Sequence, residues 1–300
     1  MKINGVFEGG GIRAIGFIGA INCFEDYNIS WNYLAGTSAG AIIAALLSSG
    51  FTGKEINKLI INTNFLKFMD KDYIQKLPLI GKPLGLIKEK SIYSGDYMEE
   101  YLYNVLGSKG VYTFKDLKEH GKYRVKFVAC DITSCKPIIL PDDLPYYDID
   151  PNEFTVAKAL RMSSSIPLYF KPVVLYKDGI PHYIVDGGVA YNYPIDIFDN
   201  ENGSFKTIGF KFELNEMESL TSSGRSDPIA FLYDLASSVP NENKRIHLID
   251  KYKEKTLLIP TMGVQSTDFE IKEDKAISLY KAGYKNAKTY LMKYLEEKAV

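Results

Sequence analysis

Three short segments carry residues whose types and spacing could perform acyl-transfer chemistry. The first is the stretch 36–40, which fits the pattern Gly-x-Ser-x-Gly with Ser38 at its centre. A nucleophilic serine of this kind needs a sharp turn between a strand and a helix, and small neighbours such as Gly36 and Gly40 let the strained backbone fit. The helix dipole and free N–H groups would favour developing negative charge beside Ser38. The alternative is a plain strand–helix turn in which the serine caps the helix.

The second segment contains three consecutive glycines, Gly9, Gly10 and Gly11, and Arg13 follows shortly after them. Consecutive glycines after a strand leave backbone N–H groups unshielded, so these groups could line an oxyanion hole. The competing interpretation is a dinucleotide-binding loop, which needs glycine at position 14 and an acidic residue at the end of the second strand. The chain has Ala14 instead, and its second strand ends in alanine and glycine. The sequence therefore favours the oxyanion hole.

The third segment is Asp186 followed by Gly187 and Gly188. An aspartate at the end of a strand with two glycines behind it places a carboxylate where other backbone can approach closely. The alternative is a tight hairpin turn, for which Asp-Gly is a common choice.

A serine–histidine–aspartate triad would require a histidine, and the chain contains His120, His182 and His247. His182 lies four residues before Asp186 on the same expected strand and should point elsewhere. His247 follows the aspartate in the order typical of α/β-hydrolases, which makes it the serious candidate. Against it, those enzymes build several strands before their nucleophile, whereas Ser38 follows one strand and one helix. The histidines show no metal-ligand spacing, so we expect no metal and no cofactor.

Together, the three segments in this order resemble the patatin-like phospholipase family. The stretches 161–167 and 170–172 also look like that family's segment before the aspartate. The resemblance covers about residues 3–200 closely and the remainder loosely. It implies a two-residue catalytic dyad, with Ser38 as the nucleophile and Asp186 as the general base. It also implies an oxyanion hole in the glycine run, built from the N–H groups among Gly9, Gly10, Gly11 and Ala39.

Arg13 matches the basic position of the family's glycine-rich loop. The chain departs from the family at the next residue, where Ala14 replaces the usual glycine. In the implied mechanism, Asp186 takes the proton of Ser38 as the serine attacks an ester carbonyl, and water then hydrolyses the acyl-enzyme.

The elements that must position these residues alternate between strands and helices, which favours a parallel sheet covered by helices. We expect an α/β fold, a three-layer α/β/α sandwich around a mostly parallel central sheet. Residues 1–300 should form one catalytic domain, with the motifs in 3–200 and with 201–300 completing the sheet and outer helices. The patterns predict strands at 3–7, 33–35, 125–130, 136–140, 183–185, 206–212 and 256–259. They predict helices at 13–27, 41–47, 94–106, 154–162 and 274–295.

The charges nearly cancel, with 36 basic and 37 acidic residues, so no nucleic-acid partner is indicated. The three cysteines, Cys23, Cys130 and Cys135, lack paired spacing, and we expect free buried thiols in a reducing compartment.

No signal peptide or spanning segment is apparent. We therefore expect a cytoplasmic protein that reaches lipid by transient peripheral association with a membrane surface. Residues 77–87, near Lys76, Lys82 and Lys88, form either an interfacial lid or an ordinary surface loop.

The expected function is a phospholipase A-type serine hydrolase acting on the fatty-acyl esters of glycerophospholipids. The alternatives within enzymes are an acyltransferase and a neutral-lipid lipase that use the same dyad. Outside enzymes, the alternative is a lipid-binding protein that has lost turnover.

Overall fold

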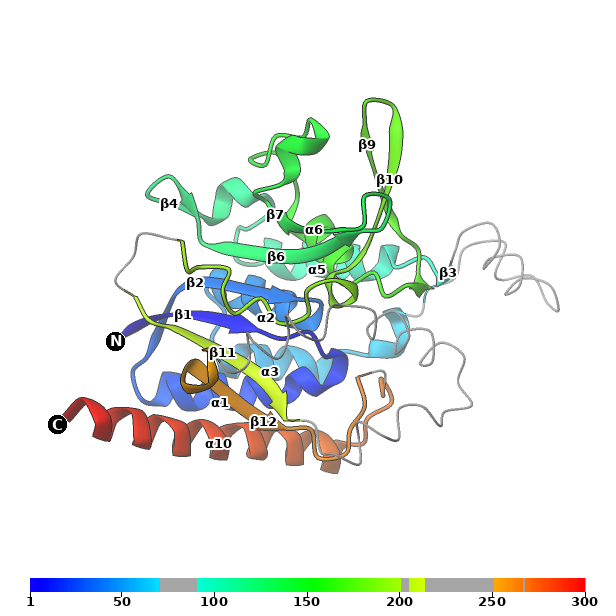
Figure 1. Ribbon diagram of the computed structural model, residues 1–300. Coiled ribbons are helices and arrows are strands. Elements are labelled where there is room, and N and C mark those ends of the chain that lie inside the picture. The colour runs from blue at the N-terminus through cyan, green and yellow to red at the C-terminus, as the bar shows by residue number, and fades with distance from the viewer. Residues whose placement is uncertain (69, 71–90, 201–204, 214–250, 267, 300) are drawn as a thin grey trace.

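The structure is a computed structural model that describes residues 1–68, 70, 91–200, 205–213, 251–266 and 268–299 (Figure 1). In these residues the main sheet has eight strands: β1 (Lys2–Phe7), β2 (Ser30–Thr37), β6 (Val125–Asp131), β7 (Lys136–Leu140), β9 (Val173–Lys177), β10 (Ile180–Asp186), β11 (Thr207–Glu213) and β12 (Thr256–Pro260). Their order is β12-β11-β1-β2-β6-β10-β9, and β7 pairs with β6.

The centre of the sheet is parallel and one side of it is antiparallel. β12, β11, β1, β2 and β6 pair in parallel, whereas β7 and β10 are antiparallel to β6, and β9 is antiparallel to β10. Two small sheets lie outside it, formed by β3 (Ser91–Tyr93) with β8 (Leu168–Phe170) and by β4 (Lys118–Glu119) with β5 (Lys122–Tyr123). The predicted α/β fold, with a mostly parallel central sheet flanked by helices, is confirmed.

The longer helices of the described chain connect and cover these strands (Figure 1). They are α1 (Ile15–Asp26), α2 (Ala39–Ser48), α3 (Gly53–Asn62), α5 (Asp96–Gly107), α6 (Val156–Ser163) and α10 (Glu273–Ala299). The short 3₁₀ helices near the site are η1 (Gly11–Ala14), η2 (Phe65–Phe68) and η6 (Gly187–Val189).

Alternation along the central strands divides the core between the two faces of the sheet. Phe7 and Leu34 belong to the large cluster that packs against the helices, whereas their neighbours Val6 and Ala35 join a smaller cluster. The division arises because successive side chains of a strand point to opposite faces of the sheet. The larger cluster contains closely packed aromatic rings, among them Phe7 and Phe210, whose centroids lie 4.7 Å apart. A firm core therefore lies directly beneath the strand ends that carry the three motifs.

Several elements of the structure were not predicted from the sequence, among them α3 and the strand β9. α3 begins at a capping box, in which Thr52 accepts a hydrogen bond from the Glu55 N–H and Glu55 accepts one from the Thr52 N–H. β9 and β10 form a hairpin, whose turn uses Asp178 and Gly179 with φ values of 52° and 77°. Both positive φ values suit the type I′ hairpin turn that Asp-Gly favours.

The prediction of three buried thiols is wrong for one cysteine. Cys23 and Cys130 are buried, and burial raises the pKa of each thiol to about 11. Cys135 is exposed, because it lies in the turn between β6 and β7 with a φ of 55°. All three are free.

Candidate active site

Ser38 lies at the turn between β2 and α2 in an unusual backbone conformation. Its φ is 54° and its ψ is −124°, and non-glycine residues hold such values only where the surroundings enforce them. A Cβ at Gly36 would lie 2.3 Å from the carbonyl carbon of Gly40, and a Cβ at Gly40 would lie 2.4 Å from the carbonyl oxygen of Phe7. The Ser38 side chain makes no capping hydrogen bond to α2. The interpretation of Ser38 as a plain N-cap is therefore excluded.

The pairing of β6 explains how Asp186 reaches this turn. β2 runs parallel to β6 and pairs with it as far as Thr37, opposite Val128. β10 runs antiparallel to β6 and ends with Asp186 opposite Ala129, the next residue along. Both strands lie on the edge of β6 that β7 leaves open. Their carboxyl ends therefore meet end to end, although Ser38 and Asp186 are 148 residues apart in the chain.

The two side chains are joined by a short hydrogen bond. Ser38 Oγ donates to Asp186 Oδ2 at 2.6 Å, and Asp186 Oδ1 accepts from the Gly188 N–H at 2.7 Å. Residues 187–189 form η6, so Asp186 does not belong to a hairpin turn. A Cβ at Gly187 would lie 2.3 Å from the Val128 carbonyl oxygen, which explains why glycine is required here. The carboxylate is thus fixed with one oxygen toward the serine.

Burial sets the acidity of this carboxyl group. Asp186 has no exposed surface, and desolvation raises its pKa from the ordinary 3.8 to about 6. The hydrogen bonds from Ser38 and Gly188 oppose this rise, because they favour the charged form. Asp186 is therefore ionised at neutral pH and is a stronger base than an exposed aspartate.

Ser163 is a site residue whose role the sequence analysis did not identify. Its Oγ accepts a hydrogen bond from the Ser38 N–H at 2.9 Å and donates one to the Val128 carbonyl at 2.6 Å. It thereby links the turn to α6 and β6. The Asp186 N–H donates to the Ser165 carbonyl at 2.9 Å, so the stretch 161–167 supports both members of the pair. The only signal in the sequence was its resemblance to the family segment.

The glycine run lies beside this turn, because Phe7 at the end of β1 pairs with Gly36 on β2. Gly9 differs from its expected role. Its N–H donates to the Asn192 carbonyl at 3.1 Å, so this N–H is already engaged and does not point to an oxyanion. A Cβ at Gly9 would lie 2.3 Å from Asn192 Oδ1, which explains the need for glycine at this position.

Gly10, Gly11 and Ala39 offer backbone N–H groups that have no hydrogen-bond partner among the described residues. Gly11 has a φ of 55°, and a Cβ there would lie 1.9 Å from the Ser266 carbonyl oxygen. Arg13 holds the loop, since its Nε donates to the Gly10 carbonyl at 3.2 Å and its guanidinium lies 5.0 Å from the Phe212 ring centroid. Ala14 has a φ of −58°, so the loop accepts alanine where the family usually has glycine.

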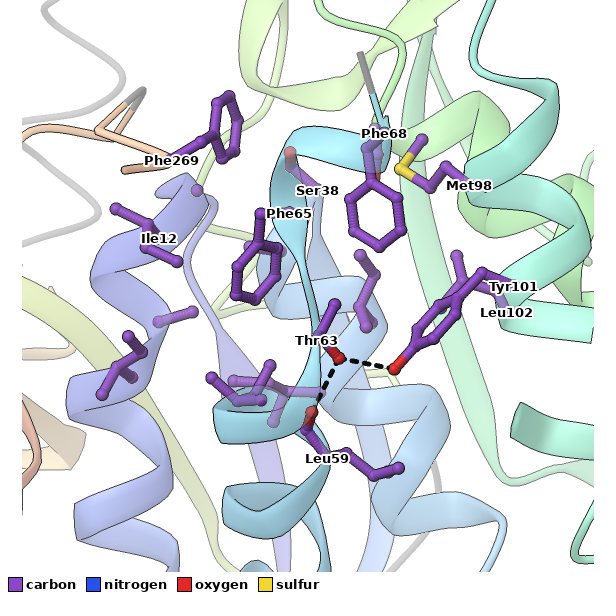
Figure 2. Close-up of a pocket in the computed structure, with 18 of the residues that line it drawn as sticks. Ile12, Ser38, Leu59, Thr63, Phe65, Phe68, Met98, Tyr101, Leu102 and Phe269 are labelled. Carbon is purple, nitrogen blue, oxygen red and sulfur yellow. Dashed lines mark hydrogen bonds between the residues drawn. The ribbon is translucent and has the colours of Figure 1, made fainter. Parts of the chain in front are cut away.

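An apolar cavity of about 130 Å³ opens beside Ser38 (Figure 2). Its walls come from α1, α2, α3, η2 and α5, and Phe269 adds a ring near the serine. On α2 the lining residues recur at helical spacing: Ala39, Ile42, Ile43 and Leu46. Ser164 also lines the cavity, and its buried Oγ has no hydrogen-bond partner among the described residues. A cavity of this kind suits a hydrocarbon chain attached to a group that reacts at Ser38.

A family model described as patatin-like phospholipase matches residues 5–199. The chain belongs to this family. The match includes the glycine run, the serine turn and Asp186, and the resemblance inferred from the motifs is confirmed.

Relatives of this chain occur in bacteria and viruses. The Bacillus subtilis (strain 168) protein YqhO is 34% identical over 295 residues, covering 98% of this chain and 99% of its own. The probable lipid hydrolase 463L of Invertebrate iridescent virus 6 is 28% identical over 196 residues, covering 64% of this chain and 61% of its own. The family and the viral relative support a lipid acyl hydrolase in general.

Solved structures share the fold at low sequence identity. VipD from Legionella pneumophila gives a TM-score of 0.58 at 15% identity, covering 97% of this chain and 67% of its own. ExoU, in its complex with SpcU from Pseudomonas aeruginosa, gives 0.51 at 16% identity, covering 98% of this chain and 52% of its own.

The histidines of this chain make other contacts where they are described. His182 Nδ1 lies 2.6 Å from Asp131 Oδ2, which also accepts from the Tyr147 hydroxyl at 2.9 Å. His120 is exposed beside Glu119. His247 lies outside the described residues, as do 77–87 and their neighbouring lysines. The partner of Ser38 Oγ is therefore Asp186 and neither described histidine.

Two kinds of feature are absent from the described residues. Within them, no cluster of three or more histidine, cysteine, aspartate or glutamate side chains could hold a metal ion. No helix among them combines the length and the apolar character needed to cross a membrane.

Proposed function

We propose that this chain is a phospholipase A-type hydrolase that cleaves fatty-acyl esters of glycerophospholipids, with Ser38 as nucleophile and Asp186 as general base. The observation that carries the proposal is the 2.6 Å hydrogen bond from Ser38 Oγ to the buried Asp186 carboxylate. The strained turn that presents Ser38 and the apolar cavity beside it support the same assignment.

In the first half of the reaction, Ser38 Oγ attacks the ester carbonyl carbon while its proton passes to Asp186 Oδ2. The N–H groups of Gly10, Gly11 and Ala39 stabilise the oxyanion, an interaction for which losing one donor typically lowers the rate by about 10²–10³. The tetrahedral intermediate then collapses, the C–O bond to the glycerol oxygen breaks, and that oxygen takes the proton from Asp186. An acyl-Ser38 ester remains.

In the second half, a water molecule attacks the acyl-Ser38 carbonyl and gives a proton to Asp186. Collapse of this intermediate returns the proton to Ser38 Oγ and releases the fatty acid. Burial that raises the pKa of Asp186 to about 6 strengthens the base while leaving it mostly ionised at neutral pH. The Asp186 carboxyl group thus acts as the acid and base in both halves of the reaction.

Access to lipid is part of the proposal. η2 contributes Phe65 and Phe68 to the cavity wall, while the neighbouring Leu66 and the Ile61 side chain on α3 are exposed apolar groups. Apolar side chains in such positions support transient docking on a membrane surface. The free cysteines fit the reducing environment of the cytoplasm.

The test uses phosphatidylcholine vesicles, with mass spectrometry of the products. We expect free fatty acid and lysophospholipid in equal amounts from the wild type, and a loss of about 10³-fold or more in Ser38→Ala and Asp186→Asn. Near-normal turnover by Asp186→Asn would refute the dyad. Release of fatty acid from triacylglycerol alone would favour the neutral-lipid lipase, and transfer of the acyl group to an added alcohol in preference to water would favour the acyltransferase. Lipid binding without any product would favour the non-catalytic alternative.

A further inference from the structure

One wall of the cavity beside Ser38 contains a hydrogen bond that joins the end of α3 to α5. Thr63, directly after α3, and Tyr101, on α5, both line the cavity, and their hydroxyl oxygens lie 2.6 Å apart (Figure 2). Thr63 Oγ1 also donates to the Leu59 carbonyl at 2.6 Å. Because a hydroxyl has a single hydrogen to donate, Tyr101 is the donor in its bond with Thr63. The three groups therefore form a chain of hydrogen bonds in which Tyr101 donates to Thr63 and Thr63 donates to the Leu59 carbonyl.

A second hollow, of about 310 Å³, lies on the other side of this link. Leu59, Thr63 and Tyr101 line both spaces. The remaining lining of the second hollow includes polar surface side chains, such as Glu55 and Asn62. The wall between the apolar cavity and the surface hollow is thus only one layer of side chains thick.

Neighbouring contacts hold the wall in place. The Phe68 ring packs against the Tyr101 ring, with centroids 5.4 Å apart. A second link between α3 and the end of α5 lies at Glu55, whose carboxylate is 2.8 Å from Lys109 Nζ. Thr63 and Tyr101 are therefore held against each other, and the cavity has a fixed wall on this side.

The residues of α2 that line the cavity give its approximate length along this helix. Lining residues run from Ser38 to Leu46, and eight residues of helix correspond to ~12 Å. An extended chain of carbon–carbon bonds of about 1.5 Å advances roughly 1.3 Å per carbon, so this distance holds about nine carbons. A chain that reaches the wall between α3 and α5 meets two hydroxyl groups that are already hydrogen-bonded within the protein, and a methylene chain offers them no new partner.

We infer that the Thr63–Tyr101 pair sets the acyl-chain length that the enzyme accepts, with medium chains preferred over long ones. The inference rests on the proposed function, because it assigns the cavity to the acyl chain of the substrate cleaved at Ser38. Removing either side chain should join the cavity to the second hollow and admit longer chains.

The test measures kcat/KM for p-nitrophenyl butyrate, decanoate and palmitate at a fixed detergent ratio. The variants are Tyr101→Ala and Thr63→Ala, and the matched control is Tyr103→Ala. Tyr103 lies on the same helix, is 42% exposed and packs against Tyr112 away from both hollows. Each methylene that gains burial can raise kcat/KM by about fourfold.

We expect the wild type to prefer decanoate to palmitate. The palmitate-to-decanoate ratio should rise by about tenfold in both Tyr101→Ala and Thr63→Ala, equivalent to nearly two buried methylenes, and should not change in Tyr103→Ala. An unaltered ratio in both variants, with butyrate turnover still dependent on Ser38, would overturn this inference and leave the proposed function standing. Butyrate turnover that persists in Ser38→Ala would overturn both.

Discussion

Asp186 must be ionised to accept a proton from Ser38, yet its surroundings favour the protonated form. The carboxyl group has no exposed surface, and the two hydrogen bonds it accepts offset the desolvation only in part. The raised pKa therefore has two consequences of opposite sign, one for the rate and one for the stability of the fold.

The rate should follow the ionisation of Asp186. Since burial raises the pKa of Asp186 to about 6, kcat/KM for a soluble ester should rise about tenfold per pH unit below that value and level off above it. The measurement is a pH–rate profile on p-nitrophenyl butyrate. A profile that is flat from pH 4 upward, or that falls as the pH rises through 6, would contradict the role of Asp186 as base.

Stability should change in the opposite direction. A folded-state pKa above the unfolded value means that the contribution of Asp186 is fully present below pH about 4 and is lost as the pH rises through about 6. Two pKa units correspond to about 3 kcal/mol. The free energy of unfolding of the wild type should therefore fall relative to Asp186→Asn between pH 4 and pH 8, as measured by urea denaturation. A constant difference between the two proteins would show that the carboxyl titrates normally.

At the scale of elements, the site depends on β2, β6, β10 and α6 meeting at one point. Ser163 on α6 holds these elements together, because its hydroxyl accepts a hydrogen bond from the Ser38 N–H and donates one to the Val128 carbonyl. Without it, both buried groups would lose this hydrogen bond. The adjacent Ser164 provides a contrast, since its buried hydroxyl has no partner among the described residues.

Ser163→Ala should therefore lower the stability by about 1–3 kcal/mol and lower kcat by about ten- to a hundredfold, because the nucleophile is displaced. Ser164→Ala, the matched control, should change the stability by less than about 0.5 kcal/mol. Thermal denaturation and initial rates on one soluble ester measure both effects. Equal losses of stability in the two variants would argue against the bridging role of Ser163.

The sequence could predict the motifs and most elements because strong local signals mark them. The order of the glycine run, the Ser38 turn and Asp186 indicated a family, and buried apolar strands such as β1 were clear from their composition. The helix α3, which forms one wall of the cavity, was missed, although its sequence carries two helix signals: the Thr52–Glu55 capping box and the helical spacing of Ile56, Leu59 and Ile60. The engagement of Gly9 by Asn192 depends on a contact between residues 183 positions apart, which no local pattern reveals.

At the scale of the whole molecule, α10 joins the end of the described chain to its beginning. It packs along α1 and beside β12 (Figure 1). The two helices approach through glycines: a Cβ at Gly283 would lie 1.8 Å from the Gly16 carbonyl oxygen, and a Cβ at Gly19 would lie 2.0 Å from the Tyr280 carbonyl oxygen. This close crossing supports α1, which follows directly from the oxyanion loop.

Gly283→Ala should lower the melting temperature, although alanine normally stabilises a helix by about 1 kcal/mol relative to glycine. The added methyl group has no space, and overpacking of this kind typically destabilises by about 1–3 kcal/mol. Lys281→Ala, at an exposed position of the same helix, should change the melting temperature little. A melting temperature that rises in Gly283→Ala would mean that the two helices do not cross this closely.

In the proposed mechanism, Asp186 activates Ser38 without a histidine. The most direct measurement exposes the wild type, Ser38→Ala, Asp186→Asn and His247→Ala to a fluorophosphonate probe and locates the label by mass spectrometry. We predict labelling of Ser38 in the wild type and in His247→Ala, no labelling in Ser38→Ala, and strongly slowed labelling in Asp186→Asn. Loss of labelling in His247→Ala would show that Ser38 needs a histidine. A wild-type rate of labelling in Asp186→Asn would show that Asp186 is not the base that activates Ser38.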